Sequence, residues 1–282
     1  MIKKIGIVGQ GFVGGSIRQF FENKTETHTF DLNGKCTSSS LEELVQQSEL
    51  IFVCLPTPMY QDGSCDLSII KNTIKAIKSL DKRKIIIIKS TVVPGTVEKL
   101  IERYDQNIIF NPEFLTETNA SNDFEMQDRI ILGGYGDALE KCNEFFTHHF
   151  QKTNIVLCSP TEAELVKYVT NTFLTTKVAY ANEIANICES LGVEYNNLSK
   201  IFTLDDRLGS SHWAVPGPDG KKGYGGSCFP KDINALIYFA KLNNVPTPVL
   251  DSVWRRNIEI DRKEQDWKNL LGRAVTLKNE DN

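Results

Sequence analysis

A cysteine at the expected start of a helix could act as a nucleophile. Cys228 precedes Pro230 and Lys231, and a helical pattern runs over residues 231–242. Proline suits the first turn of a helix, so Cys228 should lie just before it, beside N–H groups that have no partner within the helix. Those groups and the Lys231 ammonium would stabilise a thiolate and lower the pKa of the thiol. The local sequence fits an inert, buried cysteine equally well.

A glycine-rich turn follows the first predicted strand and opens the first predicted helix. It reads Gly9-Gln10-Gly11-Phe12-Val13-Gly14, a GxGxxG pattern. Its glycines permit a tight turn, a close approach of the backbone to a pyrophosphate, and close packing of helix on strand. Asp31 ends the second predicted strand, where its carboxylate would bind an adenosine ribose and repel a 2′-phosphate. This predicts NAD rather than NADP; a plain glycine turn beside a solvated aspartate is the alternative.

Two further groups of polar residues could line a site. Glu164, Lys167 and Asn171 fall at i, i+3 and i+7 of a predicted helix and share one narrow stripe. Glu113 and Glu117 follow a short predicted strand, at the carboxyl edge of the sheet, where ligands of such folds bind. A solvated helix face and a pair of surface acids are the simpler interpretations, and they stay open.

The elements that must position these residues are those of an α/β protein. Short β-branched runs predict strands at residues 3–8, 28–32, 50–55, 84–89, 108–110, 129–132 and 154–157. Amphipathic helices are predicted between most of them, at residues 13–22, 41–47, 66–80, 96–104 and 137–149. The alternation is typical of a Rossmann-type, doubly wound parallel sheet. We expect this NAD-binding domain to span residues 1–158.

The pattern changes after residue 159 and predicts a smaller, all-helical domain over residues 159–282. Residues 161–191 contain no Gly or Pro, and the helix that they predict would be roughly 45 Å long. A helix of that length usually packs against something outside its own domain. Further helices are predicted at residues 195–204, 231–242 and 248–271.

Composition and charge limit the classes of partner. Of 282 residues, 40% are hydrophobic and 24% charged, which is ordinary for a folded globular chain. The net charge of −4 comes without a basic stripe, so we expect no nucleic-acid partner. No apolar run approaches the roughly 18 residues of a membrane span, so we expect no membrane partner.

The cysteines and histidines limit compartment and metal content. The seven cysteines are odd in number, scattered and never in a CxxC pair, which favours a reducing cytoplasm over a disulfide framework or a zinc cage. The four histidines, at residues 28, 148, 149 and 212, show no metal-binding spacing. We therefore expect a cytoplasmic protein without a metal site.

Seven segments in order resemble the UDP-glucose/GDP-mannose dehydrogenase family over residues 1 to about 260. They are the glycine loop, Leu55-Pro56-Thr57-Pro58, residues 89–96, 111–117 and 164–171, Asp206-Arg207-Leu208-Gly209, and residues 225–232. Family members oxidise the primary alcohol of a sugar nucleotide to a carboxylate with two NAD. The resemblance implies NAD as cofactor, a small-molecule sugar-nucleotide substrate, and a homodimer built on the long helix.

The resemblance also implies a mechanism like that of UDP-glucose 6-dehydrogenase. Cys228 would trap an aldehyde as a thiohemiacetal, a second hydride transfer would give a thioester, and water would release the acid. Lys167 would stabilise the oxyanion, Asp232 would position water and the lysine, and Glu113 would be the base in thioester hydrolysis. Asn171 would orient the sugar.

The other matching residues have implied binding roles. Thr91 and Glu117 would join the network of water around the catalytic groups. Arg207, which would reach the neighbouring subunit's site, would contact substrate together with Glu113, Lys167, Asn171, Tyr224 and Gly225. The cofactor would be bound by Gly9, Gly11, Phe12, Val13, Gly14, Asp31, Pro56, Thr57, Thr91 and Glu117.

The family has a third, C-terminal domain that holds much of the nucleotide half of the substrate, and we expect this chain to be a short form without it. A lengthened loop over residues 218–222 carries Lys221 and Lys222, which could contact phosphate instead. Three explanations of a short form stay open: a smaller or differently held sugar, half of a split enzyme, or a relative that binds NAD without turnover. Two alternative functions also stay open, a single-hydride hydroxyacid-type dehydrogenase and a catalytically silent NAD-binding partner of another chain.

Overall fold

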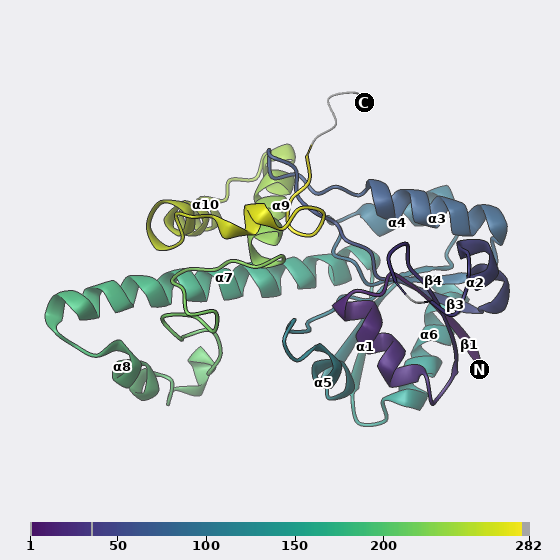
Figure 1. Ribbon diagram of the computed structural model, residues 1–282, viewed down its shortest axis with the longest axis horizontal. Coiled ribbons are helices and arrows are strands. Elements are labelled where there is room, and N and C mark those ends of the chain that lie inside the picture. Colours follow the sequence, from purple (N-terminus) through teal and green to yellow (C-terminus); the bar gives the residue numbers. More distant parts are fainter. Residues whose placement is uncertain (1, 35, 278–282) are drawn as a thin grey trace. The chain divides into compact units, whose positions relative to one another are not determined.

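The computed structural model describes residues 2–34 and 36–277. The chain forms two compact units, which Figure 1 shows together with their helices and strands. The sheet unit comprises the residues up to 57 and residues 67–167, and the helical unit comprises residues 58–66 and those from 168 onwards. The helix α7 (Pro160–Leu191) belongs to both units. The predicted domain boundaries, residues 1–158 and 159–282, stay a prediction.

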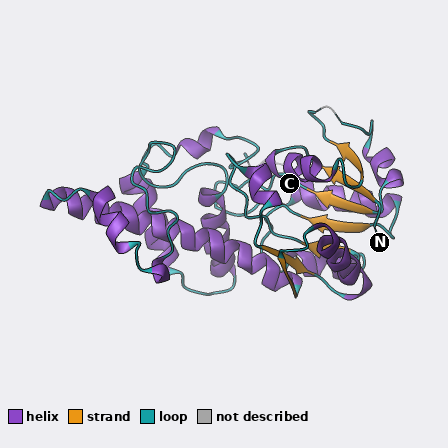
Figure 2. Ribbon diagram, turned by 90° about the horizontal axis from the view of Figure 1, so that it is seen from below, coloured by secondary structure: helices purple, strands orange, loops and turns teal. Residues whose placement is uncertain are grey.

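The described residues of the sheet unit form a seven-stranded sheet, drawn in orange in Figure 2. The strand order is β2-β1-β3-β4-β5-β6-β7. In chain order the strands are β1 (Lys4–Val8), β2 (Glu26–Phe30), β3 (Leu50–Val53), β4 (Ile85–Ile88), β5 (Ile108–Phe110), β6 (Arg129–Gly133) and β7 (Asn154–Cys158). The sheet and the long helix together confirm the predicted fold class.

The sequence had led us to expect a sheet that is parallel throughout, and the observed sheet is not. The strands from β2 to β5 pair in parallel, β6 pairs antiparallel with β5, and β7 pairs parallel with β6. The segment between β5 and β6 carries only the short helix α5 (Ala120–Glu125), which the sequence did not predict, in place of a longer crossover helix. The second strand was predicted at residues 28–32, two residues too late. The observed β2 ends at Phe30, opposite the last residue of β1.

Alternating isoleucines explain why helices cover both faces of this sheet. All four residues of β4 are isoleucine and all are buried. Successive side chains of a strand point to opposite faces, so Ile85 and Ile87 join one hydrophobic cluster and Ile86 and Ile88 join another. Residues of α1 (Phe12–Phe21) and α6 (Gly136–His149) belong to the first cluster. Residues of α2 (Leu41–Gln47), α3 (Ser68–Leu80) and α4 (Thr96–Arg103) belong to the second.

The helical unit is arranged around α7, whose predicted length is confirmed. Its other elements are α8 (Tyr195–Phe202), the 3-10 turn Asp206–Leu208, α9 (Phe229–Leu242) and α10 (Pro248–Arg256). Figure 1 shows α8 on one side of α7 and α9 and α10 on the other. One hydrophobic cluster joins α7 to α8 through Ala181 and Tyr195, and another joins α7 to α9 and α10 through Ala179, Ile233 and Val253.

The predicted helix over residues 248–271 was too long. The α-helix ends at Arg256, widens into a π turn over Asn257–Asp261, and gives way to the 3-10 turn Asp266–Asn269. The N–H of Arg262 donates to the carbonyl of Asn257 at 2.7 Å, and the regular helix ends here. The Arg262 side chain binds two carboxylates, which fixes the chain in this conformation. Periodicity alone could not show this stop, because it depends on partners elsewhere in the chain.

Candidate active site

Each glycine of the glycine loop meets a different constraint. Gly9 has φ +92°, and a Cβ there would lie 2.3 Å from the carbonyl oxygen of Cys54. A Cβ on Gly14 would lie 1.9 Å from the carbonyl oxygen of Gly9. A Cβ on Gly11 would meet nothing within 4 Å, and no side chain caps the start of α1 that Gly11 precedes. The second glycine therefore leaves an open cradle over helix N–H groups, which suits a pyrophosphate.

Asp31 lies beside this loop, as the sequence predicted. Its Oδ2 accepts a hydrogen bond from the Gln10 N–H at 2.6 Å, and its Oδ1 accepts one from the Asn33 N–H at 2.9 Å. The side-chain oxygen of Gln10 is buried and has no hydrogen-bond partner among the described residues. An orphaned acceptor, an open cradle and a carboxylate at the end of β2 are consistent with a dinucleotide at this edge of the sheet.

Buried charged residues gather after β4 and β5, and we call Lys89, Asn111, Glu113 and Lys167 the sheet-unit cluster. Lys167 Nζ donates to the carbonyl oxygen of Glu113 at 2.6 Å and to its Oε1 at 3.0 Å. The two side chains are only 4% and 8% exposed. Burial alone would raise the pKa of Glu113, but the adjacent Lys167 ammonium outweighs it and lowers the pKa. Glu113 is therefore a carboxylate at neutral pH.

Lys89 is a member of the cluster that the sequence analysis did not select. Its Nζ donates to Asn111 Oδ1 at 2.8 Å, and Asn111 Nδ2 donates to the carbonyl oxygen of Ile131 at 2.8 Å. Burial lowers the pKa of Lys89 to about 8. The available signal was a lysine placed directly after four buried isoleucines, where a charge must find a partner.

The other residues predicted for the site in this unit differ in burial and in role. Thr57 Oγ1 donates to the carbonyl oxygen of Thr91 at 2.7 Å, and both residues are buried. Pro56 and Glu117 are exposed. Glu164 is fully buried and caps α4: its two oxygens accept hydrogen bonds from the N–H groups of Gly95 and Val97, at 2.6 and 2.8 Å. Glu164 therefore holds the fold, although it shares the predicted stripe of Lys167.

A second cluster surrounds the start of α9, and we call Asn171, Cys228, Lys231 and Asp232 the helical-unit cluster. Cys228 is the residue just before α9 and is half-buried, with its Sγ 3.8 Å from Ser227 Oγ. Asn171 Nδ2 donates to Asp232 Oδ2 at 2.5 Å, and Lys231 Nζ contacts Asp232 Oδ1 at 2.5 Å. The sequence-predicted Cys228, Asp232 and Asn171 are thus brought to one helix end.

The charge of Lys231 is kept in this cluster. Burial alone would lower the pKa of Lys231, but attraction to Asp232 and to the thiolates of Cys228 and Cys65 outweighs it and raises the pKa. Lys231 is therefore an ammonium at neutral pH, and it provides a fixed positive charge at the start of α9, near Cys228.

The predicted substrate residues of the helical unit differ in exposure. The Arg207 side chain is 88% exposed and pairs with Asp205, so it projects from the surface. Tyr224 is buried, and its hydroxyl donates to the carbonyl oxygen of Val253 at 3.4 Å. Tyr224 thus serves the core of its unit, and its contacts give no support to the predicted substrate role. Gly225 lies between Tyr224 and the open Gly226.

The two lysines of the lengthened loop already have acidic or polar partners. Lys221 Nζ lies 2.7 Å from Asp266 Oδ2, and Lys222 Nζ lies 3.0 Å from Asn186 Oδ1 and 3.9 Å from Glu189 Oε2. Contact with a phosphate would have to compete with these partners. The hypothesis that the lysines of this loop contact phosphate gains no support from this arrangement.

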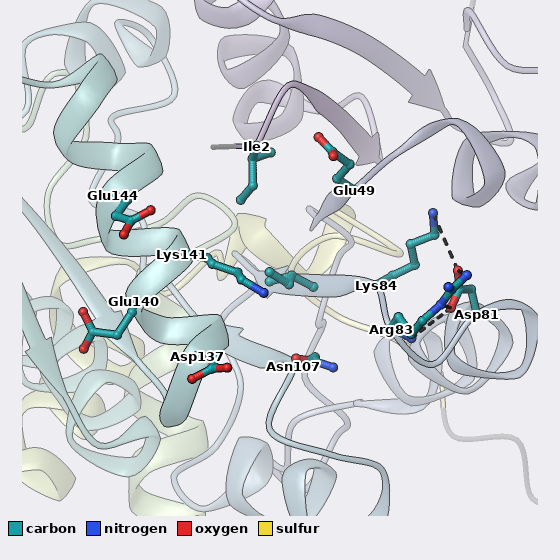
Figure 3. Close-up of a pocket in the computed structure, with 11 residues that line it drawn as sticks. Ile2, Glu49, Asp81, Arg83, Lys84, Asn107, Asp137, Glu140, Lys141 and Glu144 are labelled. Carbon is teal, nitrogen blue, oxygen red and sulfur yellow. Dashed lines mark hydrogen bonds and ion pairs between the residues drawn. The ribbon is translucent and has the colours of Figure 1, made fainter.

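A separate cavity lies at the amino edge of the sheet. It has a volume of about 610 Å³, and Figure 3 shows Asp137, Lys141 and Glu144 of α6 on one of its sides and Arg83 and Lys84 on another. Its lining includes residues that precede β1, β3 and β5. The glycine loop and the sheet-unit cluster instead follow the carboxyl ends of strands, so this cavity is not the candidate site.

The described residues contain neither a candidate metal site nor a candidate membrane span. In residues 2–34 and 36–277, no group of three or more His, Cys, Asp or Glu could hold a metal ion. No helix within the same ranges combines the length and apolar character that a membrane crossing requires.

Comparison with known proteins identifies the family of the chain. Residues 22–151 match the NAD binding domain of the UDP-glucose/GDP-mannose dehydrogenase family, and residues 161–259 match the central domain of that family. The chain belongs to this family. The match to an NAD binding domain confirms the cofactor that the glycine loop predicted.

Individual relatives give the same result. A UDP-glucose 6-dehydrogenase from Rickettsia bellii is 39% identical over 235 residues, which cover 80% of this chain and 52% of the relative. The structure of a UDP-glucose dehydrogenase from Pyrobaculum islandicum superposes with a TM-score of 0.80 at 27% identity, covering 91% of this chain and 68% of that one. The chain spans about half the length of the Rickettsia bellii relative.

A more distant likeness concerns the fold alone. A 3-hydroxyisobutyrate dehydrogenase from Mycobacterium tuberculosis superposes with a TM-score of 0.68 at 17% identity, over 90% of this chain and 92% of that chain. The combination of a Rossmann-type sheet with a helical unit is therefore not confined to the UDP-glucose/GDP-mannose dehydrogenase family. The cysteine at the start of α9, and not the fold, must carry any argument for a covalent mechanism.

Proposed function

We propose that this chain is an NAD-dependent dehydrogenase that oxidises the primary alcohol of a sugar nucleotide to a uronic acid in two steps, as UDP-glucose 6-dehydrogenases do. The observation that carries the proposal is Cys228 at the start of α9, beside Lys231, in a chain with the family's NAD binding domain. Oxidation of an alcohol to an aldehyde needs no thiol. Oxidation of the aldehyde to an acid gains from one, because a thiohemiacetal retains the C–H bond that must be broken.

NAD, when bound, accepts a hydride in each of the two oxidations. The chain would hold it through the open backbone at Gly11, the start of α1, and the Asp31 carboxylate. Phe12 and Val13 form the first turn of this helix, so their N–H groups are among those with no partner inside it. Asp31 favours NAD because a 2′-phosphate beside it would be repelled.

Cys228 would attack the aldehyde carbon, and the carbonyl oxygen would become an oxyanion. The Lys167 ammonium is suited to stabilise this charge, because burial fixes it in place and Glu113 balances it before substrate binds. Asn171 would orient the sugar through its amide oxygen, while its Nδ2 donates to Asp232. Thr91 and Glu117 would take part in the network around the hydrolytic water.

Hydrolysis of the thioester needs a base, and Glu113 meets the chemical requirement. Its pKa lies below the ordinary value because of Lys167, against the effect of burial, so the carboxylate is available to accept a proton from water at neutral pH. Asp232 is 1% exposed and bound by both Asn171 and Lys231, which fits a role in orienting these groups.

The decisive experiment counts NADH per substrate. The protein is incubated with NAD and limiting amounts of each of several UDP- and GDP-sugars, starting with UDP-glucose, and the acid product is measured with NADH. Two NADH per sugar, with loss of acid in Cys228→Ser, supports the proposal. One NADH without dependence on Cys228 indicates a hydroxyacid-type dehydrogenase. NAD binding without NADH formation across the panel indicates a catalytically silent partner protein.

We also propose a homodimer formed through α7. Apolar side chains on its helical-unit part remain between 49% and 71% exposed at Val169, Phe173, Tyr180, Ile187 and Leu191. Their spacings of four and seven residues place them along one side of the helix, as in helix pairs that bury such a stripe. The exposed Arg207 would then reach the partner's site. Light scattering should give twice the chain mass, and Phe173→Glu with Tyr180→Glu should give the monomer. The cytoplasmic location expected from the cysteines stays a prediction.

A further inference from the structure

The loop that leads to Cys228 is held by residues distant in the sequence. The Tyr224 N–H donates to Asn257 Oδ1 at 2.9 Å, and Asn257 Nδ2 donates to the carbonyl oxygen of Tyr224 at 2.9 Å. Asn257 is fully buried. A further bond from the Gly223 N–H to Asn182 Oδ1, at 3.3 Å, joins the loop to α7. The backbone at residues 223 and 224 is thus fixed from two sides.

Arg262 fixes the next residue of the loop by direct contact. A Cβ on Gly225 would lie 2.6 Å from Arg262 Cζ and 2.7 Å from its Nη2, so the guanidinium lies directly against the Gly225 backbone. Gly225 does not have a positive φ, and it is therefore the guanidinium that leaves no room for a side chain at this position. Arg262 itself is only 3% exposed.

The guanidinium is held in one orientation by two carboxylates. Arg262 Nε and Nη2 donate to Asp266 Oδ1 and Oδ2, at 2.9 and 2.7 Å, and Nη1 donates to Asp219 Oδ2 at 2.6 Å. A two-pronged bond of this kind fixes direction as well as distance. Lysine could balance the charge but could not reproduce the planar fork. The arrangement therefore has the properties of a positioning device and not only of a charge pair.

Space for a side chain opens directly after Gly225. Gly226 has φ +73°, and a Cβ there would meet nothing within 4 Å. The loop is thus clamped at residues 223–225 and open at residue 226, two residues before Cys228. Arg262 also lies beyond residue 259, where the match to the family's central domain ends.

We propose that Arg262 is a positioning residue that sets the place of the Cys228 sulfur through Gly225. The inference rests on the proposed function, in which Cys228 is the nucleophile. It makes two claims that can be separated: that Arg262 controls the exposure of the thiol, and that this control matters for turnover.

The test compares Arg262→Met with Lys78→Met, a matched control. Lys78 is also a buried, paired cation, with its Nζ 2.7 Å from Asp105 Oδ1 in the sheet unit, and the clamp does not involve it. Two experiments are done on each variant. Steady-state kinetics give kcat and KM for NAD with the best sugar nucleotide, and mass spectrometry of the Cys228 peptide gives the rate at which iodoacetamide alkylates this cysteine. The alkylation rate needs no turnover, so it decides the first claim even if the proposed function fails.

In Arg262→Met we expect kcat to fall about 10- to 100-fold, as for a nucleophile displaced by about 1 Å, with KM for NAD unchanged. The half-buried thiol should be alkylated severalfold faster, because the loop can move. Arg262→Lys should fall between this variant and the parent. Lys78→Met should lower the melting temperature without either change. A response of Arg262→Met that matches that of Lys78→Met would overturn the proposal.

Gly225→Ala tests the contact from the other side, and in the parent background it needs no Arg262 variant to fold. In the parent, the added methyl group must displace the guanidinium and should lower both the melting temperature and kcat. In an Arg262→Ala background the methyl group has space, and it should cause no further loss in melting temperature. Equal losses in the two backgrounds would show that the contact does not position the loop.

Discussion

The sheet unit and the helical unit hold their polar clusters in different ways. In the sheet unit, the charged groups Lys89, Glu113 and Lys167 are all less than a tenth exposed and bind one another or the main chain that follows β5. In the helical unit, Cys228 is half-buried at a helix start, and a loop clamped by distant side chains positions it. Asn171, Lys231 and Asp232 are as buried as the sheet-unit charges. Fold and chemistry should therefore be inseparable in the sheet-unit cluster and separable at Cys228, the half-buried member of the helical-unit cluster.

Replacement of Cys228 tests the separable side of this comparison and should have the largest effect. Cys228→Ser should lower formation of the acid about 10³-fold or more, because a hydroxyl at the same place is not ionised at neutral pH. The melting temperature should stay within a degree or two, since Sγ is part of no core cluster of its unit. Cys158→Ser, a half-buried cysteine of β7, is the control and should retain activity. An active Cys228→Ser variant would remove the covalent step from the mechanism.

Replacement of Lys167 tests the inseparable side. Lys167→Met leaves the buried Glu113 carboxylate without its cation, which should cost about 3 kcal/mol or more of stability. Turnover should fall about 10²- to 10³-fold, because the oxyanion loses its charge partner. Urea unfolding and kcat report the two effects. Adding Glu113→Gln to Lys167→Met should recover much of the stability, because the uncompensated carboxylate is removed. A Lys167→Met variant that turns over as fast as the parent would mean that the lysine serves only the fold.

How far these clusters could be predicted depended on the sequence distance of their partners. The glycine loop, the isoleucine strands and α7 follow from local patterns, and the place of Cys228 follows from Pro230 and the helix behind it. The roles of Lys89 and Arg262 could not be read locally, since their partners Asn111 and Gly225 lie on other elements. The antiparallel β6 and the end of α10 escaped prediction for the same reason.

Lys89 tests whether the sheet-unit charges matter more for stability than for chemistry. Burial lowers the pKa of Lys89 to about 8, against 10.5 for an ordinary lysine. Between these values the unfolded chain binds the proton more strongly than the folded chain does, so stability from this residue rises as pH rises from 8 to 10.5. The full difference corresponds to about 3 kcal/mol.

The measurement compares the free energy of unfolding of the parent and of Lys89→Met at pH 7.5, 9 and 10. The variant lacks the titrating group, so the stability of the parent relative to the variant should increase over this range. Contributions of other groups are common to both proteins and cancel in the difference. A difference that stays constant with pH would mean that Lys89 titrates like a solvated lysine.

Gly11 makes the finest test, because it is a position in the sheet unit where fold and function should separate. A methyl group at Gly11 meets nothing within 4 Å, whereas one at Gly14 would lie 1.9 Å from the carbonyl oxygen of Gly9. Gly11→Ala should therefore change stability by less than about 0.5 kcal/mol. It should still weaken NAD binding about tenfold, because the methyl group occupies the space through which the pyrophosphate approaches the backbone.

Gly14→Ala is the matched variant, and it should lower the melting temperature and NAD affinity together. Calorimetric titration with NAD and thermal unfolding of the two variants separate the effects without any need for turnover. If Gly11→Ala binds NAD as tightly as the parent, the open space at Gly11 is not where the pyrophosphate lies. If Gly11→Ala instead unfolds as readily as Gly14→Ala, then stability and NAD binding cannot be separated even at this open position. The sheet unit would then differ from Cys228 of the helical unit more than the contacts at Gly11 indicate.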